Sequence, residues 1–166
     1  MEKLRVGLGK NSYDIMIGEN FFEEFPKYIG EVYSGKKLFV ITDSNVHEIY
    51  EEKYKEMFKG FNYSIFVLQA GEKHKHIGIM PSIYSAMVNE GLTRKDMVVA
   101  FGGGVVGDIA GFAAASYMRG IGFIQIPTTI VSQVDSSVGG KVGVDLPEGK
   151  NLVGAFHQPK LVLIDN

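Results

Sequence analysis

A run of apolar residues leads directly into a cluster of glycines in the segment MVVAFGGGVVGD, residues 97–108. The apolar run 97–101 predicts a buried strand, and the small residues that follow predict a helix over 107–119. A strand, a glycine-rich turn and a helix in this order can enclose a phosphate between backbone N–H groups and a helix N-terminus. The spacing G-x-G-x-x-G is matched by Gly102, Gly104 and Gly107. Taken alone, this match is equally typical of a tight turn whose helix packs closely on a sheet.

Other short apolar runs predict four more strands, at 37–42, 63–68, 123–126 and 161–164. Helical patterns occur at 21–30 with Asn20 as the cap, at 46–59, and over about 14 residues that end at Asn89 before the stop residue Gly91. Residues 3–17 alternate around a Gly/Asn turn and predict a β-hairpin. Strands that alternate with helices indicate a Rossmann-like α/β fold. Its mostly parallel sheet has helices on both faces and an N-terminal β-hairpin.

Ligands of open parallel sheets bind beyond the carboxyl ends of the strands. The predicted strand ends carry polar residues or glycines, namely Asp43, Gly71–Glu72, Gly102–Gly104 and Pro127–Thr129. Because parallel strands end at the same edge of a sheet, we expect these segments to share one rim. A standard dinucleotide-binding pattern also has an acid about 20 residues after the glycines, where it holds a ribose. That position is occupied by Pro127–Thr129, so ribose or adenine recognition is assigned instead to Asp43.

Composition limits the classes of function. The net charge of −2 argues against a nucleic-acid or anionic-membrane surface, because both favour excess basic charge. The chain has no cysteine, which excludes disulfides and thiolate metal sites. It opens without a signal-peptide pattern, and its apolar run 109–115 is too short to cross a bilayer, so we expect a cytoplasmic protein. Its 166 residues suit one domain, 1–166, made of a hairpin region, 1–20, and a nucleotide-binding core, 37–166.

Two polar segments on the predicted rim have both a structural and a functional interpretation. Glu72 and Lys75 lie in a charged loop, which is most often solvated surface, but on the rim they can meet ribose hydroxyls or phosphates. Thr128 and Thr129 follow a proline that ends a strand. One of their hydroxyls is expected to cap a helix, and the other can face a ligand.

The segment 135–151 combines glycines with isolated polar residues, namely Asp135, Lys141, Lys150 and Asn151. Glycines permit a close approach of the backbone, and lysines supply point charges for phosphate. A mobile surface loop is the simpler interpretation. Isolated charges among apolar residues favour an ordered binding loop instead. The pair His74 and His76 lacks a third metal ligand, so we expect solvated histidines and no metal site in this chain.

Together these motifs resemble the amino-terminal domain of the 3-dehydroquinate synthase family. The resemblance rests on GGGVVGDIAGFAA at 102–114, YMRGI at 117–121 with PTT at 127–129, and DSSVGGK at 135–141 leading to GKNLVGAF at 149–156. It covers essentially the whole chain and is weakest before residue 37. It implies a bound NAD and the substrate 3-deoxy-D-arabino-heptulosonate 7-phosphate, which the family converts to 3-dehydroquinate with loss of phosphate. NAD oxidises a substrate hydroxyl transiently in that family, so the enzyme is a lyase.

The resemblance also implies roles for matching residues. Asp43 and Asn45 match contacts to the adenosine end of NAD. The implied NAD contacts are Asp43, Asn45, Gly71, Glu72, Lys75, Gly103, Gly104, Val105, Val106, Gly107, Asp108, Thr128, Thr129, Lys141 and Lys150. The implied substrate or catalytic residues are Asp135, Lys141, Asn151 and Arg119. Arg119 matches an arginine that reaches the substrate phosphate in the partner subunit, which implies a homodimer.

Members of the family are longer, and their second, helical domain supplies a glutamate and two histidines that bind zinc or cobalt. This chain ends at Asn166, before such residues, so we expect the C-terminal metal-binding domain to be absent and the chain to show no turnover alone. Two alternatives remain open. One is another sugar-phosphate cyclase, for example of the sedoheptulose 7-phosphate type, and the other is a non-catalytic NAD-binding module. Iron-dependent alcohol dehydrogenases share a glycine element, but the run 136–141 speaks against them.

Overall fold

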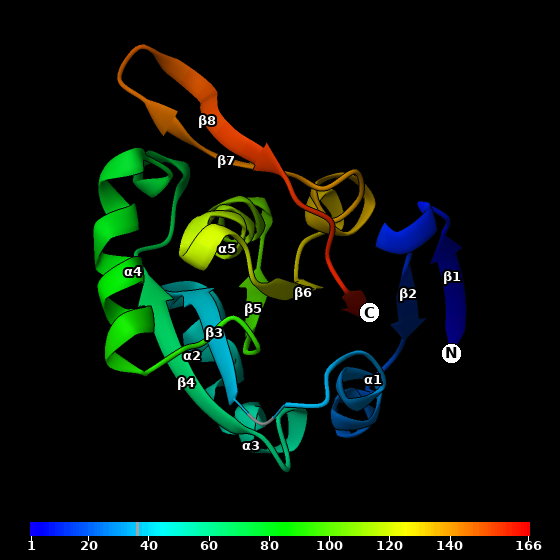
Figure 1. Ribbon diagram of the computed structural model, residues 1–166. Coiled ribbons are helices and arrows are strands. Elements are labelled where there is room, and N and C mark those ends of the chain that lie inside the picture. Colours follow the sequence, from blue (N-terminus) through cyan, green and yellow to red (C-terminus); the bar gives the residue numbers. More distant parts are fainter. Residues whose placement is uncertain (36) are drawn as a thin grey trace.

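The computed structural model describes residues 1–35 and 37–166, and its main feature is one large sheet (Figure 1). The strands of this sheet lie side by side in the order β1 (Glu2–Val6), β2 (Tyr13–Gly18), β9 (Leu161–Asp165), β6 (Gly122–Pro127), β5 (Met97–Gly102), β3 (Lys37–Asp43) and β4 (Asn62–Leu68). β1 and β2 form the predicted antiparallel hairpin, and every other neighbouring pair is parallel. The mostly parallel sheet with an N-terminal hairpin is therefore confirmed.

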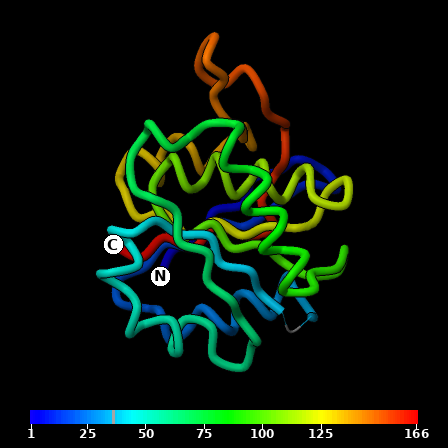
Figure 2. Tube along the Cα trace, turned by 90° about the vertical axis from the view of Figure 1, so that its left-hand side faces the viewer, coloured from blue at the N-terminus to red at the C-terminus, as the bar shows by residue number. Residues whose placement is uncertain are grey.

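Helices cover both faces of the sheet, as the alternation of strands and helices predicts (Figures 1 and 2). One face packs against α1 (Phe25–Val32), α2 (Ser44–Tyr50) and α3 (Tyr54–Met57). The other face packs against α4 (Met80–Asn89) and α5 (Gly104–Ser116). Side chains alternate between these two layers along each strand: in β3, Val40 joins the first core, whereas Phe39 and Ile41 join the second. β5 is buried along its whole length, because both of its faces are covered.

A two-stranded hairpin covers α5 on the side away from the main sheet. It consists of β7 (Lys141–Leu146) and β8 (Gly149–Phe156), and it projects beyond the helix (Figure 2). α5 approaches β7 closely at Gly111, where a Cβ would overlap Cγ1 of Val142. The expected binding loop over 135–151 is therefore corrected: most of it is a β-hairpin, preceded by a helical turn at Ser132–Ser136.

Several predicted helix boundaries are also corrected. α5 begins at Gly104 rather than at residue 107, and it ends at Ser116 before a 3₁₀ turn. The helix predicted over 46–59 is broken at Tyr50, which leaves helical geometry and packs its ring edge-on against Phe22 and Phe101. Asn20 does not cap a helix: it has a φ of 51°, and a 3₁₀ turn separates it from α1.

The end of α4 follows the sequence pattern. Gly91, with a φ of 65°, comes directly after the C-cap residue, and the N–H of Leu92 donates to the carbonyl of Met87. Glycine adopts this left-handed conformation without the steric penalty of a Cβ. Across residues 1–35 and 37–166, no helix is both long enough and apolar enough to cross a membrane.

Candidate functional site

Four neighbouring strands end at one rim, as predicted. β6, β5, β3 and β4 are adjacent and parallel, and their carboxyl ends lead into Pro127–Thr129, Gly102–Gly104, Asp43 and Gly71–Glu72. The ends of β5 and β6 are joined by a hydrogen bond from the N–H of Thr128 to the carbonyl of Gly102, at 3.0 Å. The rim therefore presents a glycine turn, a helix N-terminus and polar loops together.

The start of α5 lies in the middle of this rim. Gly103 is the N-cap residue, and within the described ranges no side chain caps the helix there. The first N–H groups of a helix have no acceptor inside the helix, so they are available to an anion. A Cβ on Gly103 would lie 3.4 Å from Cγ2 of Thr129, and one on Gly104 would lie 3.4 Å from Oγ of Ser136. Side chains at these two positions would fill the narrow space in front of the amides, and the glycines leave that space open to a ligand.

Two of the predicted NAD contacts do not face the rim. Val106 is fully buried in the core between α5 and the sheet. The N–H of Gly107 already donates to the carbonyl of Gly103, at 3.0 Å, and Gly107 is buried. Gly107 lies against the sheet, since a Cβ there would be 3.7 Å from Oε1 of Gln125. These two residues serve helix packing, and the partly exposed Gly103, Gly104 and Val105 are the ones open to a ligand.

A buried lysine connects three elements at the rim. Lys75 is only 5% exposed, so the expectation of a solvated loop is wrong for this residue. Its Nζ donates to Oδ2 of Asp108 at 2.5 Å and to Oδ1 of Asn151 at 2.7 Å. These bonds tie the loop after β4 to the first turns of α5 and to β8. Three residues that the sequence suggested separately are thus brought into one polar cluster.

The electrostatics of this cluster depend mainly on burial. Removal from water raises the pKa of the Asp108 carboxyl above its usual value, and the bond and charge of Lys75 offset only part of this rise. Glu72 and Lys150 form a second ion pair nearby, at 3.1 Å between Oε1 and Nζ. Their side chains are 50% and 70% exposed, so water and salt screen this pair, in contrast to Lys75 and Asp108.

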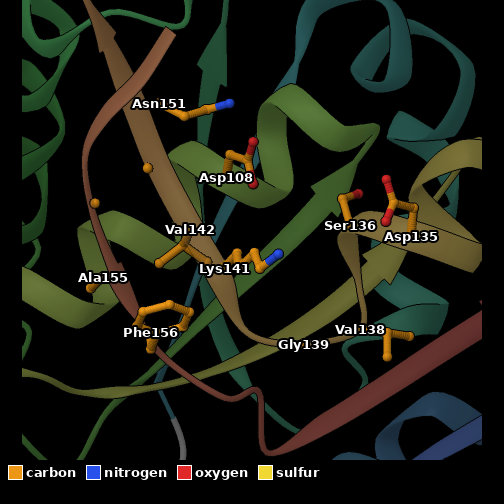
Figure 3. Close-up of a pocket in the computed structure, with 12 residues that line it drawn as sticks. Asp108, Asp135, Ser136, Val138, Gly139, Lys141, Val142, Asn151, Ala155 and Phe156 are labelled. Atoms are coloured by element: carbon orange, nitrogen blue, oxygen red, sulfur yellow. The ribbon is translucent and has the colours of Figure 1, made fainter.

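A cavity of about 630 Å³ opens between α5, the 135–141 segment and the β7–β8 hairpin (Figure 3). It brings together Asp108 and three of the predicted substrate residues, Asp135, Lys141 and Asn151. In Figure 3 the Lys141 side chain extends into the space between Asp108 and Ser136. The lining residues to which the sequence analysis gave no site role are Ser136, Val138, Gly139, Val142, Gly143, Gly154, Ala155 and Phe156. Except for Ser136, these are glycines and apolar residues, which gave no functional signal because such residues usually belong to a core.

Asp43 lies at the rim, and its carboxylate is already engaged in hydrogen bonds to the backbone that follows it. Its Oδ1 accepts hydrogen bonds from the N–H groups of Asn45 and Val46, at 2.9 and 3.0 Å, and so caps α2. Asn45 is exposed beside it. Thr129 has the expected capping role: its Oγ1 accepts from the N–H of Ser132 at 3.2 Å. Thr128 is partly exposed at the end of β6.

Arg119 is not brought to this rim. It follows α5 at the end opposite Gly104, is exposed, and has a left-handed φ of 67°. It lines a separate shallow hollow with Thr93, Arg94, Lys95 and Met118. The cavity that Lys141 lines and the hollow that Arg119 lines have no lining residue in common.

The histidine prediction is correct for one member of the pair. His76 is exposed, whereas His74 is only partly exposed, and its Nε2 is buried without a hydrogen-bond partner among the described residues. Metal-binding groups of three or more His, Cys, Asp or Glu side chains are absent from residues 1–35 and 37–166.

Comparisons with known proteins point to one family. The family model described as 3-dehydroquinate synthase N-terminal matches residues 65–166. A curated 3-dehydroquinate synthase from Clostridium acetobutylicum is 52% identical over 99% of this chain and 47% of its own length. The chain thus spans about half the length of the curated relatives it matches.

Solved structures agree with this assignment. A structure of 2-deoxy-scyllo-inosose synthase complexed with carbaglucose-6-phosphate, NAD+ and Co2+ matches 99% of this chain and 45% of its own, with a TM-score of 0.91 and 30% identity. ValA, a 2-epi-5-epi-valiolone synthase from Streptomyces hygroscopicus subsp. jinggangensis with NAD+ and Zn2+ bound, has a TM-score of 0.83 and 30% identity, over 96% of this chain and 44% of its own.

Proposed function

This chain belongs to the 3-dehydroquinate synthase N-terminal family, and from that membership we propose that it is the NAD+-binding part of a 3-dehydroquinate synthase. The reaction converts 3-deoxy-D-arabino-heptulosonate 7-phosphate to 3-dehydroquinate and phosphate. Bound NAD+ supplies a hydride acceptor that oxidises a substrate hydroxyl and later returns the hydride, so no net oxidation results. The chain's own residues bind and orient the two molecules. We propose a cytoplasmic location from composition alone.

The observation that carries the proposal is the start of α5, which no described side chain caps. The N–H groups after Gly103 have no acceptor within the helix, and the positive end of the helix dipole favours a negatively charged group there. Beside Gly104, the Oγ of Ser136 is buried without a hydrogen-bond partner among the described residues. An unpaired buried hydroxyl is costly, and a diphosphate oxygen would accept a hydrogen bond from it. The residues present therefore fit the diphosphate of NAD+.

The polar cluster fits the remaining parts of the ligands. Lys75 has three N–H donors, of which Asp108 and Asn151 take two, so one can reach a ribose hydroxyl or phosphate. Glu72 and Lys150 are exposed on the same side, so their ion pair can open and each side chain can contact a ligand instead. Asp43, Asn45, Gly71, Thr128 and Thr129 complete the proposed NAD+ contacts along the rim.

The cavity beside α5 fits a sugar phosphate. Lys141 presents an exposed ammonium there, which can pair with the phosphate or carboxylate of the substrate. Asp135 and Asn151 line the same cavity and can orient the hydroxyls of the sugar by hydrogen bonds. Because Asp108 borders both this cavity and the Lys75 cluster, it lies where cofactor and substrate would meet.

Two further elements of the function lie beyond this rim. The divalent metal, zinc or cobalt, is proposed to be bound by residues outside 1–166, where it would polarise the hydroxyl that is oxidised. Residues 1–166 alone are therefore proposed to bind NAD+ without turnover. Arg119, which is remote from its own rim, is proposed to serve the substrate site of a second copy in a homodimer.

The test is a calorimetric titration of the chain with NAD+. We expect binding by the wild type and a loss of at least about tenfold in affinity for Gly103→Val, whose side chain would stand in front of the first amides of α5. The extended backbone of Gly103, with φ −75° and ψ −170°, accommodates valine, so the fold should survive. Gly7→Val, at a glycine whose Cβ would meet nothing within 4 Å, is the control. Equal affinity of all three proteins, or no binding by the wild type, would overturn the proposal.

A second candidate is a sugar-phosphate cyclase with another substrate, favoured by the TM-scores of 0.91 and 0.83 to two such enzymes. The two candidates share the NAD+ site and differ in the sugar phosphate. Phosphate release by an active enzyme that contains this chain, measured with each candidate substrate in turn, separates them.

A further inference from the structure

The pairing of β7 with β8 shifts register between Val144 and Leu146. Val144 pairs with Val153, but the next pair is Leu146 with Gly149. Asp145 alone therefore stands opposite three residues of β8, which are Lys150, Asn151 and Leu152. A β-bulge of this kind bends the strand and redirects its side chains. Without it, the register of Val144 would place Asn151 opposite Leu146.

The backbone of the bulge is strained at Asn151, and Asp145 stabilises it with a hydrogen bond. Asn151 has a left-handed φ of 55°, which asparagine tolerates better than most residues. Its N–H donates to Oδ1 of Asp145 at 2.8 Å. The carboxylate therefore gives a strong, charge-assisted acceptor to a residue whose backbone lies outside the strand conformation.

Asp145 also anchors the loop after β4. Its own N–H donates to the carbonyl of Lys75 at 2.9 Å, and it forms an isolated parallel bridge with His76. The side chain of Lys75 returns to the hairpin, since Nζ donates to Oδ1 of Asn151. Asp145, Asn151 and Lys75 thus form a closed ring of three hydrogen bonds that joins the loop to the bulge.

We propose that Asp145 is a positioning residue that acts through Asn151 on Lys75. It keeps the bulge in place, the bulge directs the Asn151 amide oxygen at Lys75, and this contact orients the Lys75 ammonium toward the rim. The inference rests on the proposed function for its ligand, NAD+, and the ring of hydrogen bonds exists independently of it. This role could not be predicted from the sequence, because an aspartate two residues before Pro147 is typical of an ordinary turn.

The main test compares NAD+ affinities in a double-mutant cycle. We expect Asp145→Ala to weaken binding about tenfold, as the loss of one positioning hydrogen bond allows. Asp145→Asn keeps an oxygen acceptor and should bind NAD+ like the wild type. Asn151→Gly keeps the left-handed backbone and removes the amide, so adding Asp145→Ala to it should change affinity by less than about twofold. Glu148→Ala, an exposed acid in the same hairpin, is the control.

A second measurement does not require NAD+. Amide hydrogen exchange at Asn151 should be slow in the wild type, in Asp145→Asn and in Glu148→Ala, and at least about tenfold faster in Asp145→Ala. If the wild type binds no NAD+, the proposed function fails and this exchange rate alone decides the role of Asp145. Unchanged exchange in Asp145→Ala would overturn the positioning role. The positioning role would also be overturned if the affinity losses of Asp145→Ala and Asn151→Gly multiplied in the double mutant. The same holds if Asp145→Asn lost as much affinity as Asp145→Ala.

Discussion

The Nζ of Lys75 lies 2.5 Å from Oδ2 of Asp108, and the two side chains are only 6% and 20% exposed. Taking both charges out of water is costly, so such a pair needs good geometry and additional hydrogen bonds. Asn151 supplies one of these bonds, 76 residues away from Lys75 in the chain. Ligands bind at the carboxyl ends of parallel strands, and ionisable groups with shifted pKa values gather at functional sites. The pair of Lys75 and Asp108 lies at such a rim.

Removing the ammonium of Lys75 should destabilise the fold. Lys75→Met leaves the Asp108 carboxylate and the Asn151 amide oxygen without their donor, and breaking a buried pair in this way costs about 3 kcal/mol of unfolding free energy. Lys73→Met, at an exposed position in the same loop, should change it by less than about 0.5 kcal/mol. Urea unfolding measures both. Equal stability of the two variants would show that Lys75 does not hold the rim together.

The pH dependence of stability should report on Asp108. Burial raises the pKa of its carboxyl, so the folded state favours the protonated form. The stabilising contribution is complete below the unfolded pKa of about 3.9 and is lost as pH rises through the folded pKa. The unfolding free energy of the wild type minus that of Asp108→Asn should therefore fall as pH rises above about 4. A difference that grows over this range would mean that Lys75 outweighs burial.

The packing of the hairpin on α5 can be tested at one glycine. A Cβ on Gly111 would overlap Cγ1 of Val142, so Gly111→Ala should lower the unfolding free energy by about 1 to 3 kcal/mol. The matched control is Gly30→Ala in α1, where a Cβ meets nothing within 4 Å and helix propensity should add up to about 1 kcal/mol. Adding Val142→Ala to the Gly111→Ala variant should restore part of the lost unfolding free energy. Thermal or urea unfolding measures both variants. A change of unfolding free energy in the same direction for Gly111→Ala and Gly30→Ala would contradict this packing.

The exposed pair of Lys150 and Glu72 should matter for binding rather than for stability. With exposures of 70% and 50%, the pair is screened, and Lys150→Gln should change the unfolding free energy by less than about 0.5 kcal/mol. NAD+ affinity should fall in this variant and become less sensitive to salt, because one cation that faces the ligand is lost. Titrations at two salt concentrations measure this effect. A large loss of stability with unchanged affinity would be the opposite result.

Much of the fold could be predicted because both faces of the sheet are covered. Strands buried on both sides are continuous apolar runs, so 37–42 and 97–101 are visible in the sequence, and parallel pairing then puts their polar ends on one rim. The N-cap at Thr129 and the stop at Gly91 follow from local chemistry. Such features depend on residues that are close together in the chain.

The missed features depend on contacts between distant residues. The hairpin needs Gly143 to face Gly154 with almost no space between the backbones, and a glycine-rich segment shows no strand alternation. Lys75 becomes buried only because Asp108 and Asn151 come to it, and a charged loop otherwise indicates solvent. Val106 and Gly107 fit a phosphate-binding motif by spacing, yet α5 begins early enough to turn both into the core.

The most direct test of the account is a crystal structure of this chain grown with saturating NAD+. We expect the diphosphate at the first amides of α5, next to Gly103 and Gly104, with a ribose within hydrogen-bonding distance of Lys75 or Asp108. A dinucleotide bound elsewhere, or an empty rim at a concentration that saturates binding in solution, would contradict the account.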